Sequence, residues 1–582
     1  MRVLCSGLRF LCVGVVLASA CGSGDQLRAA SPAACEQSLI SSWQQSLPSV
    51  GFASAASAAA YDAEIAALLD RPWMGHPLST YPGGRWPAVS VAVVQQGRLV
   101  FAKSYGFANI SQPQLAHPDD LFRLASDSKQ ITGAVILKLI ADGQSVDGDP
   151  AHRLTLQSKV FQILASPPGA LAPLAGPGTL HADLDDITVE DLLHHAGGWN
   201  GGVGDPVDYA GKPGAVLPPT DKDVVRYMMN QPVQHRPHGS TYCYSNFGYN
   251  VLATLVEKIT GRSYESVAKD LVLRPLGITR MKIGDSLKSG AGEVTYYAAE
   301  GGGNLRSLFP EMTGPTVSGE DAPYGSWSLY AGRGAGGWIG SAMDMVRFQI
   351  GVDGTGPVQL FSSPQAMVSS ANISPNACYP NYNPATQWYN AGWIVVKNGV
   401  WGHDGGATGA GSNTTKLPNG DGYAAVINMS AAPPKGEVFD WDGALSRAYH
   451  RTLANGGSFL KTDLFDQFGE WTAWRGKAGI SSNAAHDLGA GCAYKGKNYS
   501  ACYPSRIEGR QTRAGASYRA EFVPLHAGGE VKYSLGAACN DFAAMDKKYL
   551  SGGYHRVNLQ WFEDPAGRMR FQSVWVKAAD RR

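Results

Sequence analysis

The chain has 582 residues, with 49 lysines and arginines against 48 aspartates and glutamates, so its formal net charge is +1. A chain of this length can form roughly two to four domains and bury a large core. The balanced charge provides no electrostatic footprint for nucleic acid, and we expect no nucleic-acid partner. Glycine and tryptophan are abundant, with 71 and 14 residues, which is typical of a loop-rich globular protein.

The start of the chain has the pattern of an export signal. Arg2 and Arg9 form a basic region, the residues up to Leu17 an apolar core, and Ala18-Ser19-Ala20 a small-residue cleavage site. Cys21 follows directly, as in a bacterial lipoprotein signal, although Leu17 is one place too far from Cys21 for a full match. We therefore expect an exported protein. It is either periplasmic, anchored to a membrane by a lipid on Cys21, or secreted.

An exported protein can form disulfides. Six cysteines remain beyond the signal and Cys21, which is an even number. Cys492 and Cys502 are close in sequence and are expected to pair, and Cys378 is the expected partner of Cys243. No cysteine or histidine spacing indicates a metal site, and we expect neither a metal nor a cofactor.

The chain divides into four predicted segments: the signal at 1–21, a flexible linker at 22–55, a main domain at 56–455 and a C-terminal module at 456–582. A helix is expected at 54–69, and glycine- and proline-rich stretches at 199–220 and 285–335 are expected to form long surface loops.

Strands are predicted near both ends of the main domain, and helices between them. The pattern indicates one hairpin early, a second with an Asn-Gly turn late, and a following strand, at 88–94 with 99–103, 392–396 with 400–403, and 422–429. The simplest way to bury such a chain is one antiparallel sheet built from both ends, with helices on its faces. This is an α+β fold.

Ser126 and Lys129 stand three residues apart at the start of a long apolar segment. On a helix, positions i and i+3 lie on one face, so the hydroxyl and the amine would be neighbours. A serine hydroxyl needs an adjacent base to become a nucleophile, and a buried lysine with a lowered pKa can be that base. Because a bare S-x-x-K also occurs by chance, the interpretation depends on two later motifs.

The second motif is Tyr244-Ser245-Asn246, in which a phenol near Lys129 could carry the Ser126 proton to a leaving group. Tyr244 could instead simply pack in the core. The third motif is His403-Asp404-Gly405-Gly406, on a predicted strand. Its glycines allow close approach of a substrate carbonyl, and the backbone N–H of Gly406 could join that of Ser126 as an oxyanion hole.

Together and in this order, the motifs resemble those of the serine β-lactamase and penicillin-binding-protein superfamily. The branch they resemble contains class C β-lactamases, D-Ala-D-Ala carboxypeptidases and family VIII esterases. His403-Asp404-Gly405 lies where class C enzymes have Lys-Thr-Gly. The resemblance covers about residues 60–450. It implies a β-lactamase/transpeptidase-like antiparallel sheet flanked by helices, with an inserted, mostly helical subdomain.

The resemblance implies acyl transfer on a small-molecule or peptide substrate, with an acyl-enzyme on Ser126. Lys129 and Tyr244 would handle protons, and Asn246 would orient Lys129 or the substrate. His403, Asp404 and Gly405 would contact the substrate. Asp404 departs from the family pattern, because a carboxylate there repels a substrate carboxylate, unless the side chain turns away. His403 is also a weaker carboxylate anchor than lysine.

The residues thus favour an exported serine hydrolase that acts on an ester or amide. The alternatives are a β-lactamase or D-Ala-D-Ala carboxypeptidase and, from another class, a non-hydrolytic penicillin-binding-like envelope protein. His194 and His195 are expected to close a helix C-terminus. The C-terminal module is expected to contain a helix capped by Asn540 or Asp541 and an aromatic hairpin. It weakly resembles the accessory module of polyglycine hydrolases.

Overall fold

The computed structural model describes residues 87–577, with gaps at 111–113, 175–179, 299–303, 320, 363–373, 375, 380–381, 430–449, 451–470, 473–491, 495–496, 500–501, 513–514, 525–529 and 567. The export signal, the linker and the helix expected at 54–69 lie outside the described residues, as does the predicted domain boundary at residue 455.

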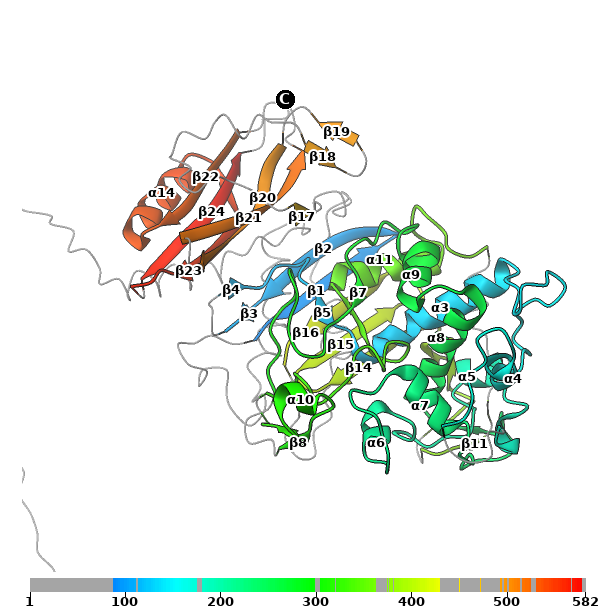
Figure 1. The fold of residues 1–582 in the computed structure, drawn as a ribbon. Helices are drawn as coiled ribbons and strands as arrows, with labels where there is room; N and C mark the ends of the chain where they lie inside the picture. Colours follow the sequence, from blue (N-terminus) through cyan, green and yellow to red (C-terminus); the bar gives the residue numbers. More distant parts are fainter. Residues whose placement is uncertain are drawn as a thin grey trace, which may run out of the picture.

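A seven-stranded antiparallel sheet joins the two ends of the main domain (Figure 1). Its order is β12-β13-β14-β15-β16-β1-β2. In the register, Val91 of β1 lies opposite Ala425 of β16. This confirms the predicted α+β fold with one sheet built from both ends. The strands are β1 (Val89–Gln95), β2 (Arg98–Tyr105), β12 (Gln387–Asn390), β13 (Trp393–Val396), β14 (Trp401–Ala407), β15 (Ala410–Lys416) and β16 (Gly422–Ile427).

Two strands of this sheet were not expected from the sequence. The edge strand β12 is only four residues long. Strand β15 is polar and lacks apolar alternation, yet all seven of its residues are buried. Its hydroxyls find partners inside the protein: Ser412 Oγ donates to the Leu124 carbonyl at 2.6 Å, and Thr414 Oγ1 to Asp127 Oδ1 at 2.6 Å. Tertiary hydrogen bonds therefore make a polar strand suitable for the interior.

Helices pack on the sheet and gather on one side of it, and in the sequence they lie between the strands that its two ends contribute (Figure 1). Helix α11 (Ala342–Val352) packs on β1, β2 and β16, and its Phe348 ring stacks on Trp393 with centroids 6.2 Å apart. Helix α3 (Ser128–Ala141) packs on α8 (Asn246–Thr260). The other helices of this region are α4 (Val160–Ala165), α5 (Val189–Leu193), α6 (Pro206–Ala210), α7 (Asp221–Met228) and α9 (Tyr264–Ala268).

The two expected loops contain short elements. The first carries α6, and the second carries β8 (Leu305–Arg306), α10 (Pro310–Thr313) and β9 (Thr316–Val317). In the described residues both stretches are therefore mainly loop, as expected, interrupted by these short elements. Proline at the first helical position starts α6 and α10, because its fixed φ suits the first turn.

The C-terminal module contains the expected helix and hairpin, preceded in the described residues by six strands that were not expected, of which β17 (Trp471–Thr472), β18 (Cys492–Tyr494) and β19 (Lys497–Tyr499) are short. Its helix begins two residues earlier than a cap at Asn540 would allow. Ala538 is extended, with φ −64° and ψ 156°, and is the N-cap residue, so Asn540 and Asp541 lie inside the helix. The elements are β20 (Cys502–Thr512), β21 (Gly515–Pro524), β22 (Glu530–Ala537), α14 (Cys539–Ser551), β23 (His555–Glu563) and β24 (Met569–Lys577).

Aromatic side chains of this module are core residues. Trp561, Phe571 and Trp575 are buried in a cluster that also includes Phe107 of β3 (Phe107–Asn109) in the main domain. The Phe107 and Trp561 rings meet edge to face at 6.0 Å. These aromatics therefore pack the module against the main domain.

None of the described helices is long and apolar enough to cross a membrane.

Candidate active site

Ser126 lies in a 3₁₀ turn (η3, Ala125–Asp127) immediately before α3, rather than in the α-helix itself. Ala125 has a φ of +43°, a conformation that non-glycine residues rarely adopt. The turn is held on both sides. Ser128 Oγ accepts a hydrogen bond from the Trp338 backbone at 3.1 Å, and Asp127 accepts from Thr414 of the sheet. Such enforced strain is typical of functional sites.

Lys129 is fully buried one helical turn after Ser126. Its Nζ lies 3.0 Å from Ser126 Oγ, 2.8 Å from Asn246 Oδ1 and 2.9 Å from the Ala335 carbonyl oxygen. The last two groups can only accept hydrogen bonds. In the neutral amine they take both N–H groups, and the lone pair then faces the Ser126 hydroxyl. The predicted serine–lysine pair is therefore placed as a nucleophile and base require.

Burial lowers the pKa of Lys129 to about 7, although Asp205, Asp404 and Asp127 work in the opposite direction. The Lys129 ammonium also faces the Tyr244 ring, with Nζ 4.7 Å from its centroid. Near neutral pH, a large fraction of Lys129 is thus the free base.

The rate of reaction is expected to follow this titration. Lys129 accepts a proton only when it is neutral, so kcat/KM for an uncharged ester should rise between about pH 6 and 8 and then level off. A pH–rate profile with buffers of constant ionic strength measures this. A midpoint near that of an ordinary lysine, or a flat profile, would contradict the assignment of Lys129 as the base.

Tyr244 lies next to this pair. Burial raises the pKa of Tyr244 well above its ordinary value, despite a hydrogen bond with the Ser126 side chain. The residue therefore stays a neutral phenol at neutral pH and can donate a proton. The predicted Ser126, Lys129 and Tyr244 are brought together.

Asn246, the first residue of α8, connects Lys129 to a carboxylate that the sequence interpretation missed. Its Oδ1 accepts from Lys129, and its Nδ2 donates to Asp205 Oδ2 at 3.1 Å. Asp205 is the N-cap residue of α6 but makes no capping hydrogen bond with its side chain. Its carboxylate instead fixes the Asn246 amide so that the amide oxygen faces Lys129. The motif Asp-Pro at a helix start was the available signal, although it indicates only a cap.

His403 of β14 is neutral. Its Nδ1 contacts the Asp404 carbonyl oxygen, which can only accept, so Nδ1 carries the hydrogen, and Nε2 accepts from the Tyr389 hydroxyl at 2.9 Å. Burial lowers the pKa of His403 to about 3. His403 therefore offers a substrate carboxylate neither a positive charge nor a free N–H group. Tyr389, on the unpredicted strand β12, is the partner that fixes this state.

The two adjacent histidines at the end of α5 have different roles from one another. His194 is the C-cap residue, as expected, and its Nδ1 donates to the Tyr389 carbonyl at 2.8 Å. His195 has a φ of +57° and packs its ring on Tyr244, with centroids 4.2 Å apart. Its Nδ1 accepts from the Ser245 backbone at 3.1 Å. His195 therefore supports the Tyr244 motif rather than the helix end.

Asp404 and Gly405 follow His403 along β14. Asp404 is exposed, yet the surrounding protein still raises the pKa of its carboxyl by desolvation. Its charge raises the pKa of Tyr244 and opposes the lowering of that of Lys129, so the Asp404 carboxylate acts electrostatically on both residues. Gly405 lies against the nucleophile: a Cβ there would be 3.0 Å from the Ser126 nitrogen.

Two neighbouring glycines allow a matched test of this close approach. In Gly405→Ala, the new methyl group would lie 2.2 Å from the Leu124 carbonyl oxygen and 2.3 Å from Ser412 Oγ, so β14 must move away from η3. We expect a loss of kcat/KM of about 10²-fold, since a shift near 1 Å has that effect, together with a lower Tm. In Gly406→Ala, the methyl group meets nothing within 4 Å. Its Tm should match the wild type; equal Tm losses would contradict the packing.

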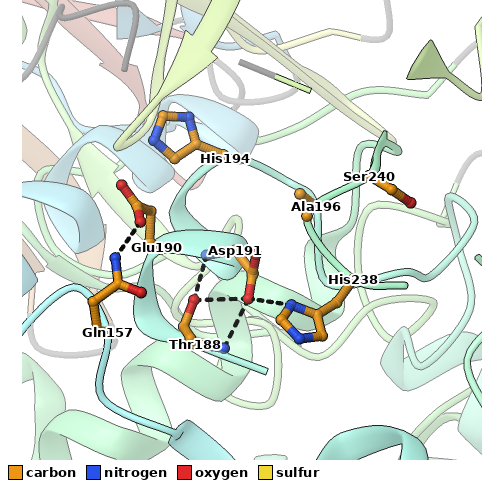
Figure 2. A pocket seen from close by; sticks show the side chains of 9 residues that line it. Gln157, Thr188, Glu190, Asp191, His194, Ala196, His238 and Ser240 are labelled. Atoms are coloured by element: carbon orange, nitrogen blue, oxygen red, sulfur yellow. Dashed lines mark hydrogen bonds and ion pairs between the residues drawn. The ribbon is translucent and has the colours of Figure 1, made fainter. Parts of the chain in front are cut away.

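A pocket lies at the start of α5 (Figure 2). It has a volume of about 540 Å³ and includes His194, Glu190, Asp191 and His238 in its lining. Its polar groups pair with one another: the Thr188 and Asp191 side chains form a capping box, and His238 Nδ1 lies 2.6 Å from Asp191 Oδ2. No serine–lysine pair is among the residues that line it.

Cys243 and Cys378 form a disulfide with Cα atoms 5.2 Å apart, the pairing expected from the sequence. It fastens the short strand β6 (Thr241–Tyr242) to β11 (Asn376–Ala377) beside Tyr244. His235 lies 3.2 Å from the Cys378 sulfur, but both sulfurs of this group are bonded to each other. Cys502 and Cys539 each belong to a disulfide as well. The Cys492 side chain lies outside the described residues, so its pairing with Cys502 stays a prediction.

A family model described as Beta-lactamase matches residues 63–449, which is more than half of the chain. The chain belongs to the beta-lactamase family. This confirms the predicted superfamily and makes this family member a serine hydrolase. The likeness of its C-terminal module to that of polyglycine hydrolases stays a prediction.

Named relatives of this beta-lactamase-family protein are about a quarter identical to it over the aligned regions. An Escherichia coli K12 protein named "Putative D-alanyl-D-alanine carboxypeptidase" is 26% identical over 50% of this chain and 67% of the relative. An Aspergillus campestris protein named "Unguisins hydrolase" is 27% identical over 60% of this chain and 59% of the relative. A solved structure of D-amino acid amidase from Ochrobactrum anthropi is similar to 68% of this chain and 99% of that chain, with 18% identity and a TM-score of 0.48.

Proposed function

We propose that this protein is an exported serine hydrolase that forms an acyl-enzyme on Ser126 and hydrolyses an ester or amide bond. The proposal is carried by Lys129, whose amine lies 3.0 Å from Ser126 Oγ with a pKa of about 7. Export is supported by the signal pattern that ends at Cys21 and by the Cys243–Cys378 disulfide, which is typical of oxidising compartments. A lipid on Cys21 would anchor the protein to a membrane.

In the proposed mechanism, Ser126 Oγ attacks the substrate carbonyl while its proton passes to Lys129. The backbone N–H groups of Ser126 and Gly406 would stabilise the oxyanion, since β14 runs directly past the Ser126 nitrogen. The proton then returns through the neutral Tyr244 phenol to the leaving alcohol or amine. Water attacks the acyl-enzyme with the same residues acting in reverse, which releases the acid and restores Ser126.

The third motif bears on the substrate. His403 is neutral and fully engaged, and the adjacent Asp404 carboxylate repels anions. Substrates without a carboxylate next to the scissile bond are therefore favoured over penicillins or peptides that end in D-alanine. Because the E. coli relative is named as a putative D-alanyl-D-alanine carboxypeptidase, a D-Ala-D-Ala carboxypeptidase or β-lactamase is the second candidate.

The test compares residues 22–582 with the Ser126→Ala variant on p-nitrophenyl butyrate, a chromogenic cephalosporin and an acyl-D-Ala-D-Ala peptide. Ser126-dependent ester turnover, with a mass increase of one butyryl group on the quenched enzyme, supports the proposal. Rapid turnover of the cephalosporin or peptide instead supports the second candidate. Stable acylation by penicillin without release would indicate the non-hydrolytic envelope protein, and equal rates for wild type and variant would overturn the serine mechanism.

A further inference from the structure

The strand that passes the Ser126 nitrogen has an exposed carboxylate, that of Asp404. Apart from its own backbone N–H, no group in the described part of the chain donates a hydrogen bond to the Asp404 carboxylate or pairs with it. The Asp404 side chain is exposed, and the next residue of β14, Gly405, lies against the Ser126 nitrogen. A carboxylate in this position is available to a ligand.

A wall of tyrosine rings stands next to the same site. Tyr242 and Tyr382 are stacked, with centroids 4.4 Å apart and planes 14° from parallel, and Tyr379 lies 6.2 Å from Tyr242. Tyr379 is 44% exposed. A methyl group on Gly201 would lie 3.2 Å from the Tyr379 hydroxyl and 3.5 Å from the Tyr244 carbonyl oxygen, so the wall adjoins the Tyr244 motif. The Asp404 charge also reaches it, because it raises the pKa of Tyr242.

The wall is built rigidly. Tyr242 and Tyr379 directly flank the Cys243–Cys378 disulfide, and the Cys378 backbone donates to the Tyr242 carbonyl at 2.9 Å. A preformed aromatic surface costs little ordering on binding. The faces of tyrosine rings carry negative potential and attract ammonium groups, as does a carboxylate.

We propose that Asp404 and the tyrosine wall bind a protonated amine of the substrate, so that this hydrolase selects esters or amides of amino acids with a free amino group over uncharged acyl groups. This rests on the proposed function and names its substrate class. A cation bound there stabilises the ionised form of the Asp404 carboxyl. It therefore lowers the pKa of Asp404, which desolvation alone raises. Of the three carboxylates that interact with Lys129, namely Asp127, Asp205 and Asp404, only Asp404 is exposed.

A matched substrate set tests the proposal. D-alanine and L-alanine p-nitroanilides carry an ammonium group at neutral pH where isobutyryl p-nitroanilide, of nearly the same shape, carries a methyl group. The same three acyl groups are measured as methyl esters, so that an enzyme limited to esters is also tested. The readout is the ratio of kcat/KM for the aminoacyl substrate to that for the isobutyryl substrate.

We expect this ratio to exceed about tenfold for at least one alanine enantiomer and to fall by about tenfold in Asp404→Asn, as for loss of one charge-assisted contact. Tyr379→Leu should lower it by about two- to fivefold, the range for an exposed cation–π contact. Asp142→Asn, at the far end of α3 where Asp142 pairs with Lys138, is the control and should leave the ratio unchanged.

Two results would overturn the inference alone: a preference for the isobutyryl substrate, or the same ratio in wild type and Asp404→Asn while hydrolysis still depends on Ser126. If Asp404→Asn loses the aminoacyl preference and its Tm also collapses, the loss could come from unfolding. The Asp404→Glu variant keeps the charge and should restore part of the ratio if Asp404 binds the amine. If no substrate of the set and no p-nitrophenyl ester shows Ser126-dependent hydrolysis, the proposed function fails and the inference with it.

Discussion

Replacing Lys129 with methionine is expected to lower kcat/KM by about 10²- to 10⁴-fold, the usual contribution of a general base. Methionine fills a similar volume in the buried position but accepts no proton. The amine is the group that lies between Ser126 Oγ, Asn246 Oδ1 and the Ala335 carbonyl, so nothing else in this arrangement can take its place. Steady-state kinetics on p-nitrophenyl butyrate measures the effect.

The same helix supplies the control. Lys138→Met removes a partly exposed lysine whose only described ion pair is with Asp142, and its kcat/KM should stay within about twofold of wild type. The rise of activity through pH 7 should also disappear in Lys129→Met while it persists in Lys138→Met. A Lys129→Met enzyme with the wild-type rate and pH profile would show that Ser126 is activated by another group.

The catalytic centre was predictable because its spacing is local. Ser126 and Lys129 are three residues apart, and Tyr244 and Asn246 are two residues apart, so each pair lies on one short continuous stretch at the start of a helix. The hairpins of the sheet were predictable for a similar reason, because apolar runs and an Asn-Gly turn mark them in the sequence.

The residues that tune these groups were not predictable in this way. Asp205 and Tyr389 lie in a glycine-rich loop and on a four-residue edge strand, and each reaches the site only because the whole domain has folded. Strand β15 was missed because its polar residues are satisfied by partners some 290 residues away in the chain, such as Asp127. Local propensity contains no information on such distant partners.

Asp404 shows how far a motif can be interpreted without coordinates. The sequence indicated that it departs from the family pattern but left open which way its side chain points. Asp404 is exposed and directly precedes Gly405, which lies against the Ser126 nitrogen, and the neutral His403 supplies no competing cation. The proposed preference for an amine therefore combines a sequence departure with tertiary contacts.

Replacing Arg333 with methionine is expected to destabilise the main domain by about 3–5 kcal/mol, the range for breaking a buried ion pair. Arg333 is only 2% exposed, and its Nη2 lies 2.7 Å from Asp221 Oδ2 and 3.0 Å from Glu257 Oε1. Burial alone would lower the pKa of Arg333, but the two carboxylates raise it above its ordinary value. Without the guanidinium, two largely buried carboxylates lose their counter-charge.

The loss should reach the active site as well. Arg333 anchors the segment that contains Ala335, whose carbonyl accepts from Lys129, so kcat should fall along with stability. Differential scanning calorimetry should show a Tm lower by about 4–7 °C, given the unfolding entropy of a domain of this size.

A surface ion pair provides the comparison for this variant. Arg274 is exposed and pairs with Asp270, and Arg274→Met should change stability by less than about 1 kcal/mol. The triple variant Arg333→Met, Asp221→Leu, Glu257→Met should recover much of the Tm, because it removes the unpaired charges together with their partner. If Arg333→Met and Arg274→Met shifted the Tm equally, the cluster would not be the stabilising element that its burial implies.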